Sequence, residues 1–276
     1  MQELVSIIMP SYNSASYIGR SIESIMTQTY TNWELLITDD CSTDGTQDIL
    51  HAYAMRDSRI RVLQMTENKG PGYARNYSIE MAQGRYIAFC DSDDCWLPMK
   101  LERQIALMQK RRCALSFTSY FTCDEKGKVN GLVMAPKQLT LSELKHDNKI
   151  GCLTAMYDTQ ICGKRKMPTI RKRQDWALVL GIMKDHPIAY GIQVPMAVYR
   201  VRDFSVSRSK FGLIKYNAQV YRDVFDYSTL HSYAYLFGIF MPTYLSKQVQ
   251  NLINNQRYKQ LWSEMKWIRC EWSHVE

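Results

Sequence analysis

Short apolar runs alternate with stretches of helical periodicity over residues 4–90. The apolar runs predict strands at 5–9, 33–38, 60–65 and 86–90. Between them, apolar side chains at helical spacing predict helices over 14–28, through Ile49 and Tyr53, and from near Pro71 to near Gly84. Strands that alternate with helices in this way are typical of βαβ units, so we expect an α/β fold whose sheet is mainly parallel and has helices on both faces.

The pattern changes after Trp96. Further predicted elements are a helix at 98–109, strands at 114–123 and 128–134 joined by a turn, a short helix at 141–147, and strands at 151–157 and 193–199. From residue 211 onward aromatic and long apolar side chains dominate, and helices are predicted over 230–245 and 257–272. We therefore expect an α/β domain over 1–210 and a C-terminal helical extension over 211–276.

Each of the first four predicted strands ends near a polar loop. The loops contain Tyr12 and Asn13, Asp39 and Asp40, residues 68–72, and residues 91–94. Right-handed crossovers bring the loops after successive parallel strands to one edge of the sheet, where open α/β sheets bind their ligands. Four polar loops around one crevice favour a nucleotide site.

The last of these loops carries three carboxylates within four positions. Asp91 and Asp93 are two residues apart, so one turn can direct both toward a single ion. Hard carboxylate oxygens suit Mg²⁺ or Mn²⁺, which commonly use one or two carboxylates together with substrate phosphates. The alternative interpretation is a solvated acidic turn.

Composition narrows the classes of protein that fit. Of the 276 residues 46% are hydrophobic, which supports a core and argues against disorder. The formal net charge of +8 favours anionic partners such as phosphates, acidic lipid headgroups or nucleic acid. Because residues 1–3 lead directly into a strand, we expect no signal peptide. The eight cysteines include no CxxC pair, so we expect reduced thiols in a cytosolic protein.

Two late features each have more than one interpretation. A basic run over 164–173 ends at Asp175, and it is either an anion-binding surface or a solvated loop. Asp175 itself is either a catalytic group or the N-cap of a helix that begins at Trp176. The stretch 230–245 is too short and too interrupted for a membrane span, so it predicts an interfacial helix, a helix pair packed on the first domain, or a dimer surface.

Three sequence blocks stand at the ends of the first, second and fourth predicted strands. They are VSIIMPSYN at 5–13, DDCSTDG at 39–45 and DSDD at 91–94, and a weaker block, QDW, follows at 174–176. In this order and at this spacing they resemble family 2 glycosyltransferases of the GT-A fold, which are inverting enzymes of bacterial polysaccharide and lipopolysaccharide synthesis. The resemblance covers residues 4–210, which would then form the catalytic domain. Many members have Glu-Asp in the last block where this chain has Gln174 and Asp175.

The resemblance implies a role for each matching residue. Asp40 would contact the nucleotide base, Asp93 would bind Mn²⁺ or Mg²⁺ with help from Asp91, and Asp175 would act as general base. The implied donor-binding residues are Pro10, Tyr12, Asn13, Asp40, Lys69, Arg75, Asp91, Ser92, Arg200 and Arg202. Some members supply a His to the diphosphate from a late loop, and this chain has Arg200 and Arg202 there, so cationic contacts to the phosphates are expected.

The implied reaction moves a sugar from a nucleotide-diphosphate donor, with a UDP-sugar favoured, to a hydroxyl of a saccharide acceptor linked to a polyprenyl diphosphate. Such a transfer requires the leaving diphosphate to be neutralised and the attacking hydroxyl to be deprotonated. A single base opposite the leaving group inverts the anomeric centre. We expect a cytoplasmic enzyme attached peripherally to the anionic inner face of the plasma membrane, with a homodimer as the alternative use of the aromatic helices.

Two rival classes fit the sequence less well. A nucleotidyltransferase shares the sheet and the acids, but it needs a Gly-x-Gly loop after the first strand, where this chain has PSYN at 10–13. A basic nucleic-acid-binding protein needs a recognised motif or a dense basic and aromatic face. Neither is present, so no nucleic-acid partner is expected.

Overall fold

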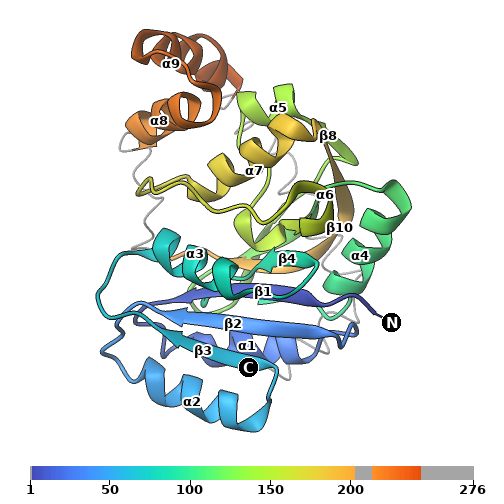
Figure 1. Cartoon of the computed structure of the whole chain (residues 1–276), viewed down its shortest axis with the longest axis vertical. Helices are drawn as coiled ribbons and strands as arrows, with labels where there is room; N and C mark the ends of the chain where they lie inside the picture. Colours follow the sequence, from blue (N-terminus) through green and yellow to red (C-terminus); the bar gives the residue numbers. More distant parts are fainter. Residues whose placement is uncertain (1, 203–212, 244–276) are drawn as a thin grey trace.

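The computed structural model describes residues 2–202 and 213–243 (Figure 1). Within these residues one ten-stranded sheet has the spatial order β3-β2-β1-β4-β9-β6-β10-β5, with β7 beside β6 and β8 beside β10. The strands are β1 (Val5–Ser11), β2 (Trp33–Asp39), β3 (Ile60–Gln64), β4 (Tyr86–Phe89), β5 (Cys95–Trp96), β6 (Leu115–Cys123), β7 (Val129–Val133), β8 (Gln138–Thr140), β9 (Met156–Asp158) and β10 (Ile188–Arg200).

Helices surround this sheet. The α-helices are α1 (Ile18–Met26), α2 (Thr46–Arg56), α3 (Pro71–Met81), α4 (Lys100–Arg111), α5 (Leu141–His146), α6 (Thr159–Cys162), α7 (Gln174–Asp185), α8 (Ile214–Phe225) and α9 (Thr229–Tyr235). A 3₁₀ turn, η1 (Cys152–Thr154), and a π-helical segment, η3 (Leu236–Phe240), complete the described elements.

The first four strands are parallel to one another. β1 pairs with β2 on one side and with β4 on the other, and β2 pairs with β3, all in parallel. The crossovers α1, α2 and α3 follow the predicted order, so the expected α/β fold is confirmed. Beyond β4 the sheet is mixed, because β9 runs antiparallel to both β4 and β6, whereas β10 runs parallel to β6.

Two hydrophobic layers cover the two faces of the sheet, because successive side chains of a strand point to opposite faces. Ile7 of β1 packs in one layer with Ile22 of α1, and this layer also holds apolar side chains of α2 and α4. Ile8 packs in the other layer with Ile79 of α3, and this layer continues through α7 into α8. Figure 1 shows α1 and α2 on one side of the parallel strands and α3 on the other.

Three local predictions differ from the structure. The strand expected over 151–157 is η1 followed by β9, because the Thr154 amide and hydroxyl both donate to the Gly151 carbonyl and close a tight turn. β10 begins earlier than the expected strand at 193–199. The short strands β5 and β8 were not predicted from the sequence, and both pair antiparallel with β10.

The described part of the C-terminal extension packs on the α/β domain. Ala218 and Val220 of α8 and Phe240 of η3 belong to the same hydrophobic layer as Trp176 of α7. In Figure 1, α8 and α9 lie together at the end of the molecule that holds α5 and α7. No helix within 2–202 and 213–243 has both the length and the apolar character to cross a membrane. The helix predicted over 257–272 lies outside the described residues.

Candidate active site

A cleft of about 1240 Å³ opens where the polar loops after β1, β2 and β4 meet. Its lining combines both signs of charge, with the acidic turn after β4 and the start of α7 contributing to one cavity. The predicted site residues that line it are Pro10, Tyr12, Asp40, Arg75, Asp91, Ser92, Asp93, Asp175, Arg200 and Arg202. The sequence prediction that these loops share one crevice therefore holds. Asn13 and Lys69 are not among the lining residues.

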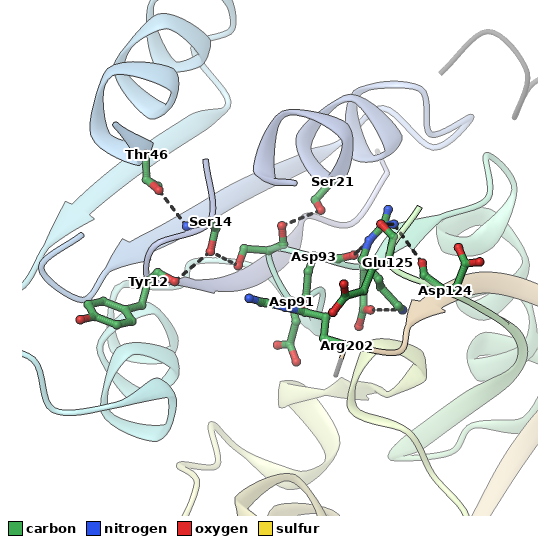
Figure 2. A network of polar contacts seen from close by, with 12 residues as sticks. Tyr12, Ser14, Ser21, Thr46, Asp91, Asp93, Asp124, Glu125 and Arg202 are labelled. Atoms are coloured by element: carbon green, nitrogen blue, oxygen red, sulfur yellow. Dashed lines mark hydrogen bonds and ion pairs between the residues drawn. The ribbon is translucent and has the colours of Figure 1, made fainter. Parts of the chain in front are cut away.

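Hydroxyl groups connect the loop after β1 to the acidic turn (Figure 2). The Oγ atoms of Ser14 and Ser92 lie 2.8 Å apart, and the Ser21 hydroxyl donates to the Ser92 carbonyl at 2.9 Å. The backbone N–H of Ser14 donates to Thr46 Oγ1 at 2.9 Å. These bonds fix the first loop while the Tyr12 ring remains half exposed at the cleft.

Asn13 shapes the loop after β1 and does not face the cleft. Its φ of 47° lies in the left-handed region, which Asn tolerates better than most residues. Its side-chain oxygen accepts from the Thr43 N–H at 2.8 Å, and its own N–H donates to Ser42 Oγ at 2.9 Å. Asn13 thus joins the loops after β1 and β2.

Asp40 is buried, and its carboxylate closes the loop that precedes α3. Its two oxygens accept from the N–H groups of Lys69 at 2.9 Å and Gly70 at 2.7 Å. Asn68 also donates to the Asp40 carbonyl. The Lys69 ammonium points elsewhere and pairs with Glu67 at 2.6 Å. Lys69, which is predicted to bind the donor, therefore contributes its main chain to this region.

Each acid of the Asp-x-Asp pair faces an arginine. Asp91 pairs with Arg75 at 2.5 Å, and Asp93 pairs with Arg202 at 3.2 Å. Burial and the nearby Asp91 raise the pKa of Asp93, and Arg202 opposes that shift. Burial lowers the pKa of the Arg75 guanidinium, but Asp91, Cys152 and Asp175 raise it, and together they raise the pKa overall. The two pairs place two cations beside the two acids of the turn.

The Arg200 side chain binds main-chain carbonyl groups. Its guanidinium donates to the carbonyls of Asp93 at 3.1 Å, Asp124 at 3.3 Å and Glu125 at 2.9 Å (Figure 2). The side chain is buried and also lies over the Tyr17 ring. In this arrangement Arg200 holds the acidic turn against the β6–β7 connection, so the predicted phosphate contact is better placed on Arg202.

Asp94 has a structural role that the sequence analysis did not predict. Its carboxylate accepts from the Arg200 N–H at 2.9 Å, which joins the acidic turn to the end of β10. Burial, with Asp93 and Asp91 nearby, raises the pKa of Asp94 well above its ordinary value. The block DSDD marked Asp94 as part of an acidic turn, but the local sequence does not distinguish this structural acid from Asp91 and Asp93.

Asp175 lies in the first turn of α7 and not at its N-cap, which is Arg173. The alternative interpretation of Asp175 as the cap of a helix beginning at Trp176 is therefore wrong. Among the described residues no hydrogen bond or ion pair engages the Asp175 carboxylate, which lines the cleft with Asp91 and Asp93. The neighbouring Gln174 donates to the Ile170 carbonyl at 2.5 Å and packs on Gly72 of α3.

The acidic pair fits a divalent cation. Among the described residues no three His, Cys, Asp or Glu side chains are arranged to hold a metal ion. Mg²⁺ and Mn²⁺ do not need such a cage, because one or two carboxylates together with donor phosphates suffice. Asp93 and Asp91, which are partly exposed and line the cleft, provide such a donor set.

A mixed α/β sheet with a polar cleft at the ends of its parallel strands is the architecture of GT-A transferases, and solved structures share it. TarS from Staphylococcus aureus, solved in complex with UDP, aligns with a TM-score of 0.64 over 83% of this chain and 68% of that chain, at 20% identity. The mannosyltransferase PcManGT from Pyrobaculum calidifontis, in complex with GDP-Man and Mn²⁺, aligns with a TM-score of 0.62 over 86% of this chain and 70% of that chain, at 18% identity.

Sequence comparison gives the family. The model of "Glycosyl transferase family 2" matches residues 6–206. A putative teichuronic acid biosynthesis glycosyltransferase, TuaG of Bacillus subtilis, is 44% identical over 80% of this chain and 88% of its own length. The Escherichia coli glucosyltransferase WfgD is 40% identical over 77% of this chain and 83% of its own length. The chain belongs to glycosyl transferase family 2 and is a glycosyltransferase, as the resemblance implied.

Proposed function

We propose that this glycosyltransferase moves a sugar from a UDP-sugar to a hydroxyl of a lipid-linked saccharide, with inversion, in the synthesis of a cell-surface polysaccharide. The observation that carries the proposal is the cleft itself. It joins an Asp-x-Asp pair flanked by arginines to a further acid, Asp175, which makes no hydrogen bond or ion pair among the described residues.

The printed names of relatives support the substrate classes. WfgD is a UDP-Glc:α-D-GlcNAc-diphosphoundecaprenol β-1,3-glucosyltransferase, so it uses a UDP-sugar and an acceptor on a lipid diphosphate. WfaP, 36% identical over 76% of this chain, carries the same description. The name of TuaG refers to teichuronic acid biosynthesis. A UDP-sugar donor and a lipid-linked acceptor are therefore the classes we assign to this chain.

The donor half of the cleft would bind the nucleotide through the loops after β1, β2 and β4. The half-exposed ring of Tyr12 can stack on the base, beside Pro10 and Asp40. Asp91 would contact the ribose, and Asp93 would hold Mn²⁺ or Mg²⁺, which when bound neutralises the leaving diphosphate as a Lewis acid. Arg202, at 3.2 Å from Asp93, would bind the same phosphate oxygens.

Asp175 would act on the acceptor. A carboxylate without a hydrogen-bonded partner can accept the proton of an attacking hydroxyl. With the diphosphate bound at Asp93 and the hydroxyl at Asp175, attack comes from the side opposite the leaving group and inverts the anomeric centre. A single base of this kind implies a single displacement without a covalent glycosyl intermediate.

Basic side chains continue the cleft on the acceptor side. Lys149, Arg171 and Lys172 line it together with Asp175. Arg and Lys at such a position suit the oxygens of a lipid diphosphate. We assign only the end of the basic run 164–173, which lines the cleft, to the lipid diphosphate, because the earlier part of the run pairs with acids elsewhere. The reaction would then take place at the cytoplasmic face of the membrane that carries the lipid.

The test is the Asp175→Asn variant. Asn keeps the size of the side chain but cannot accept the proton, so turnover with UDP-sugar and acceptor should fall about 10²-fold or more. Binding of UDP with Mn²⁺, measured by thermal shift, should persist because Asp175 faces the acceptor. Loss of UDP binding in step with turnover would make Asp175 a nucleotide-binding or structural residue instead. The same assay with DNA or RNA in place of UDP should show no stabilisation.

A further inference from the structure

We propose that Asn217 of α8 is a positioning residue for the base Asp175, which makes the C-terminal helices part of the catalytic apparatus. The inference rests on the proposed role of Asp175. It concerns a residue far from that acid in sequence, in a segment beyond the family match at 6–206.

The backbone just before Asp175 has a conformation that needs external support. Arg173, the N-cap of α7, has φ 69° and ψ 19°, in the left-handed region that non-glycine residues rarely occupy. The cap makes no side-chain hydrogen bond to the helix it begins. Within this segment Gln174 is fixed by its bond to the Ile170 carbonyl, whereas the Arg173 side chain is held by a partner outside α7.

Asn217 supplies that support from another helix. Its Oδ1 accepts a hydrogen bond from Arg173 Nε at 2.9 Å, and Asn217 is buried, at 4% exposure. A buried amide with a charged partner has few alternatives, so the bond restrains both ends. The adjacent residues make a second, weaker contact, because the Lys172 ammonium lies 5.9 Å from the centroid of the Tyr216 ring.

The residue after Asp175 is fixed by the same helical extension. The Trp176 ring is fully buried and packs edge-on against the Tyr221 ring of α8, with 5.6 Å between centroids. It also packs in a tilted arrangement against the Phe240 ring of η3, with 5.4 Å between centroids. Its Nε1–H donates to the Leu144 carbonyl at 3.0 Å. Contacts from α8 and η3 thus hold the chain on both sides of Asp175.

The experiment compares Asn217→Ala with Asn217→Asp, which keeps the accepting oxygen. The Ala variant should lose about 10- to 100-fold in kcat, the scale expected when a reacting group is misplaced by about 1 Å. Its KM for donor and its UDP binding should be unchanged, and the Asp variant should recover most of the rate. The matched control is Asp223→Ala, an exposed position on α8, which should behave as the wild type.

A double mutant separates positioning from general stability. If Asn217 acts through the base, Asn217→Ala should cost little further activity in the Asp175→Asn background. A full additional loss there, a parallel fall in UDP binding, or unchanged kcat in Asn217→Ala would overturn the inference. If Asn217→Ala does not fold, Phe240→Leu tests the contact on the Trp176 side and should lower kcat with donor KM intact; unchanged kcat there overturns the inference too.

The outcomes also distinguish this inference from the function on which it rests. If Asp175→Asn slows transfer and Asn217→Ala does not, only the positioning role fails. If Asp175→Asn retains full turnover, the assignment of the base fails and the inference falls with it.

Discussion

Lys100 places an ammonium group in the interior of the domain, at 0% exposure. Its Nζ donates to Gln104 Oε1 at 2.7 Å and lies 3.8 Å from the centroid of the Trp96 ring. Burial lowers the pKa of Lys100 to about 7. No carboxylate pairs with it within the described residues, so the charge is balanced only by an amide and an aromatic face.

This burial makes stability depend on pH. The unfolded chain keeps the Lys100 proton up to about pH 10.4, whereas the folded chain releases it above about 7. Because the unfolded state binds more protons between these values, the free energy of unfolding should rise with pH across that window. Below pH 7 the full cost of the buried charge remains.

Lys100→Met should therefore stabilise the protein at neutral pH and below. The expected gain is roughly 1 kcal/mol or more, or about 2–4 °C in Tm for a domain of this size. The gain should shrink toward pH 10, because Lys100 is uncharged in the folded wild type at that pH. Urea unfolding at several pH values measures it, with exposed Lys110→Met as control. A Met variant less stable than wild type at pH 6 would mean that the Trp96 and Gln104 contacts outweigh the cost.

Asp93 carries the prediction about the metal. Asp93→Ala should abolish transfer and remove the Mn²⁺-dependent part of UDP binding, because it deletes a hard oxygen ligand next to the diphosphate. Calorimetric titration of UDP with and without Mn²⁺ measures this without reference to activity. Asp48→Ala is a suitable control, since Asp48 is an exposed acid on α2, away from the acidic turn. Full turnover of the wild type in excess chelator would exclude the metal role.

Helices and strands with a strong local sequence pattern could be predicted. Strands that form only because they pair with a distant part of the chain could not. β1 to β4 and their helices follow from apolar runs and breakers alone. β5 consists of Cys95 and Trp96, too short for any periodicity, and exists because these residues pair with Ala197 and Val198. β10 begins early because Gly191 lets the strand approach the Pro136 carbonyl, where a Cβ would come within 2.1 Å of the oxygen.

The candidate site also has a part that could be predicted from the sequence and a part that could not. The acidic turn and the loops after β1 and β2 are contiguous blocks, so their shared edge could be inferred from strand order. The pairing of Arg202 with Asp93 and the backbone role of Arg200 join positions far apart in sequence. Only the packing of β10 beside β5 and β6 brings them together, and no local pattern carries that information.

At the scale of the whole molecule, part of the C-terminal extension contributes side chains to the hydrophobic core of the α/β domain. Of the three interpretations offered by the sequence, packing on the α/β domain is seen for α8, α9 and η3. This packing leaves part of the extension apolar and exposed, with Leu230 at 82% and Phe237 at 56%. Packing on one side thus coexists with an outward apolar surface, which is available to a membrane or to a second copy.

We expect this surface to bind anionic membranes. The net charge of +8 attracts acidic lipid, and exposed aromatic and aliphatic groups suit the boundary between lipid and water. The full chain should sediment with liposomes of anionic lipid at low salt and be partly released at about 1 M salt, where the Debye length is about 3 Å. Point variants are preferable to truncation, because α8 and η3 contribute to the core.

Leu230→Glu combined with Phe237→Glu should weaken that binding and leave the thermal unfolding midpoint nearly unchanged, since both side chains are exposed. Met55→Glu is the matched control, because Met55 is 88% exposed on α2, a helix on the opposite face of the sheet from α3 and α7. If the full chain does not bind anionic liposomes at low salt, the prediction that this surface attaches to membranes is wrong. Sedimentation over a range of protein concentrations then tests the remaining use of the surface, a homodimer, which the same double variant should dissociate.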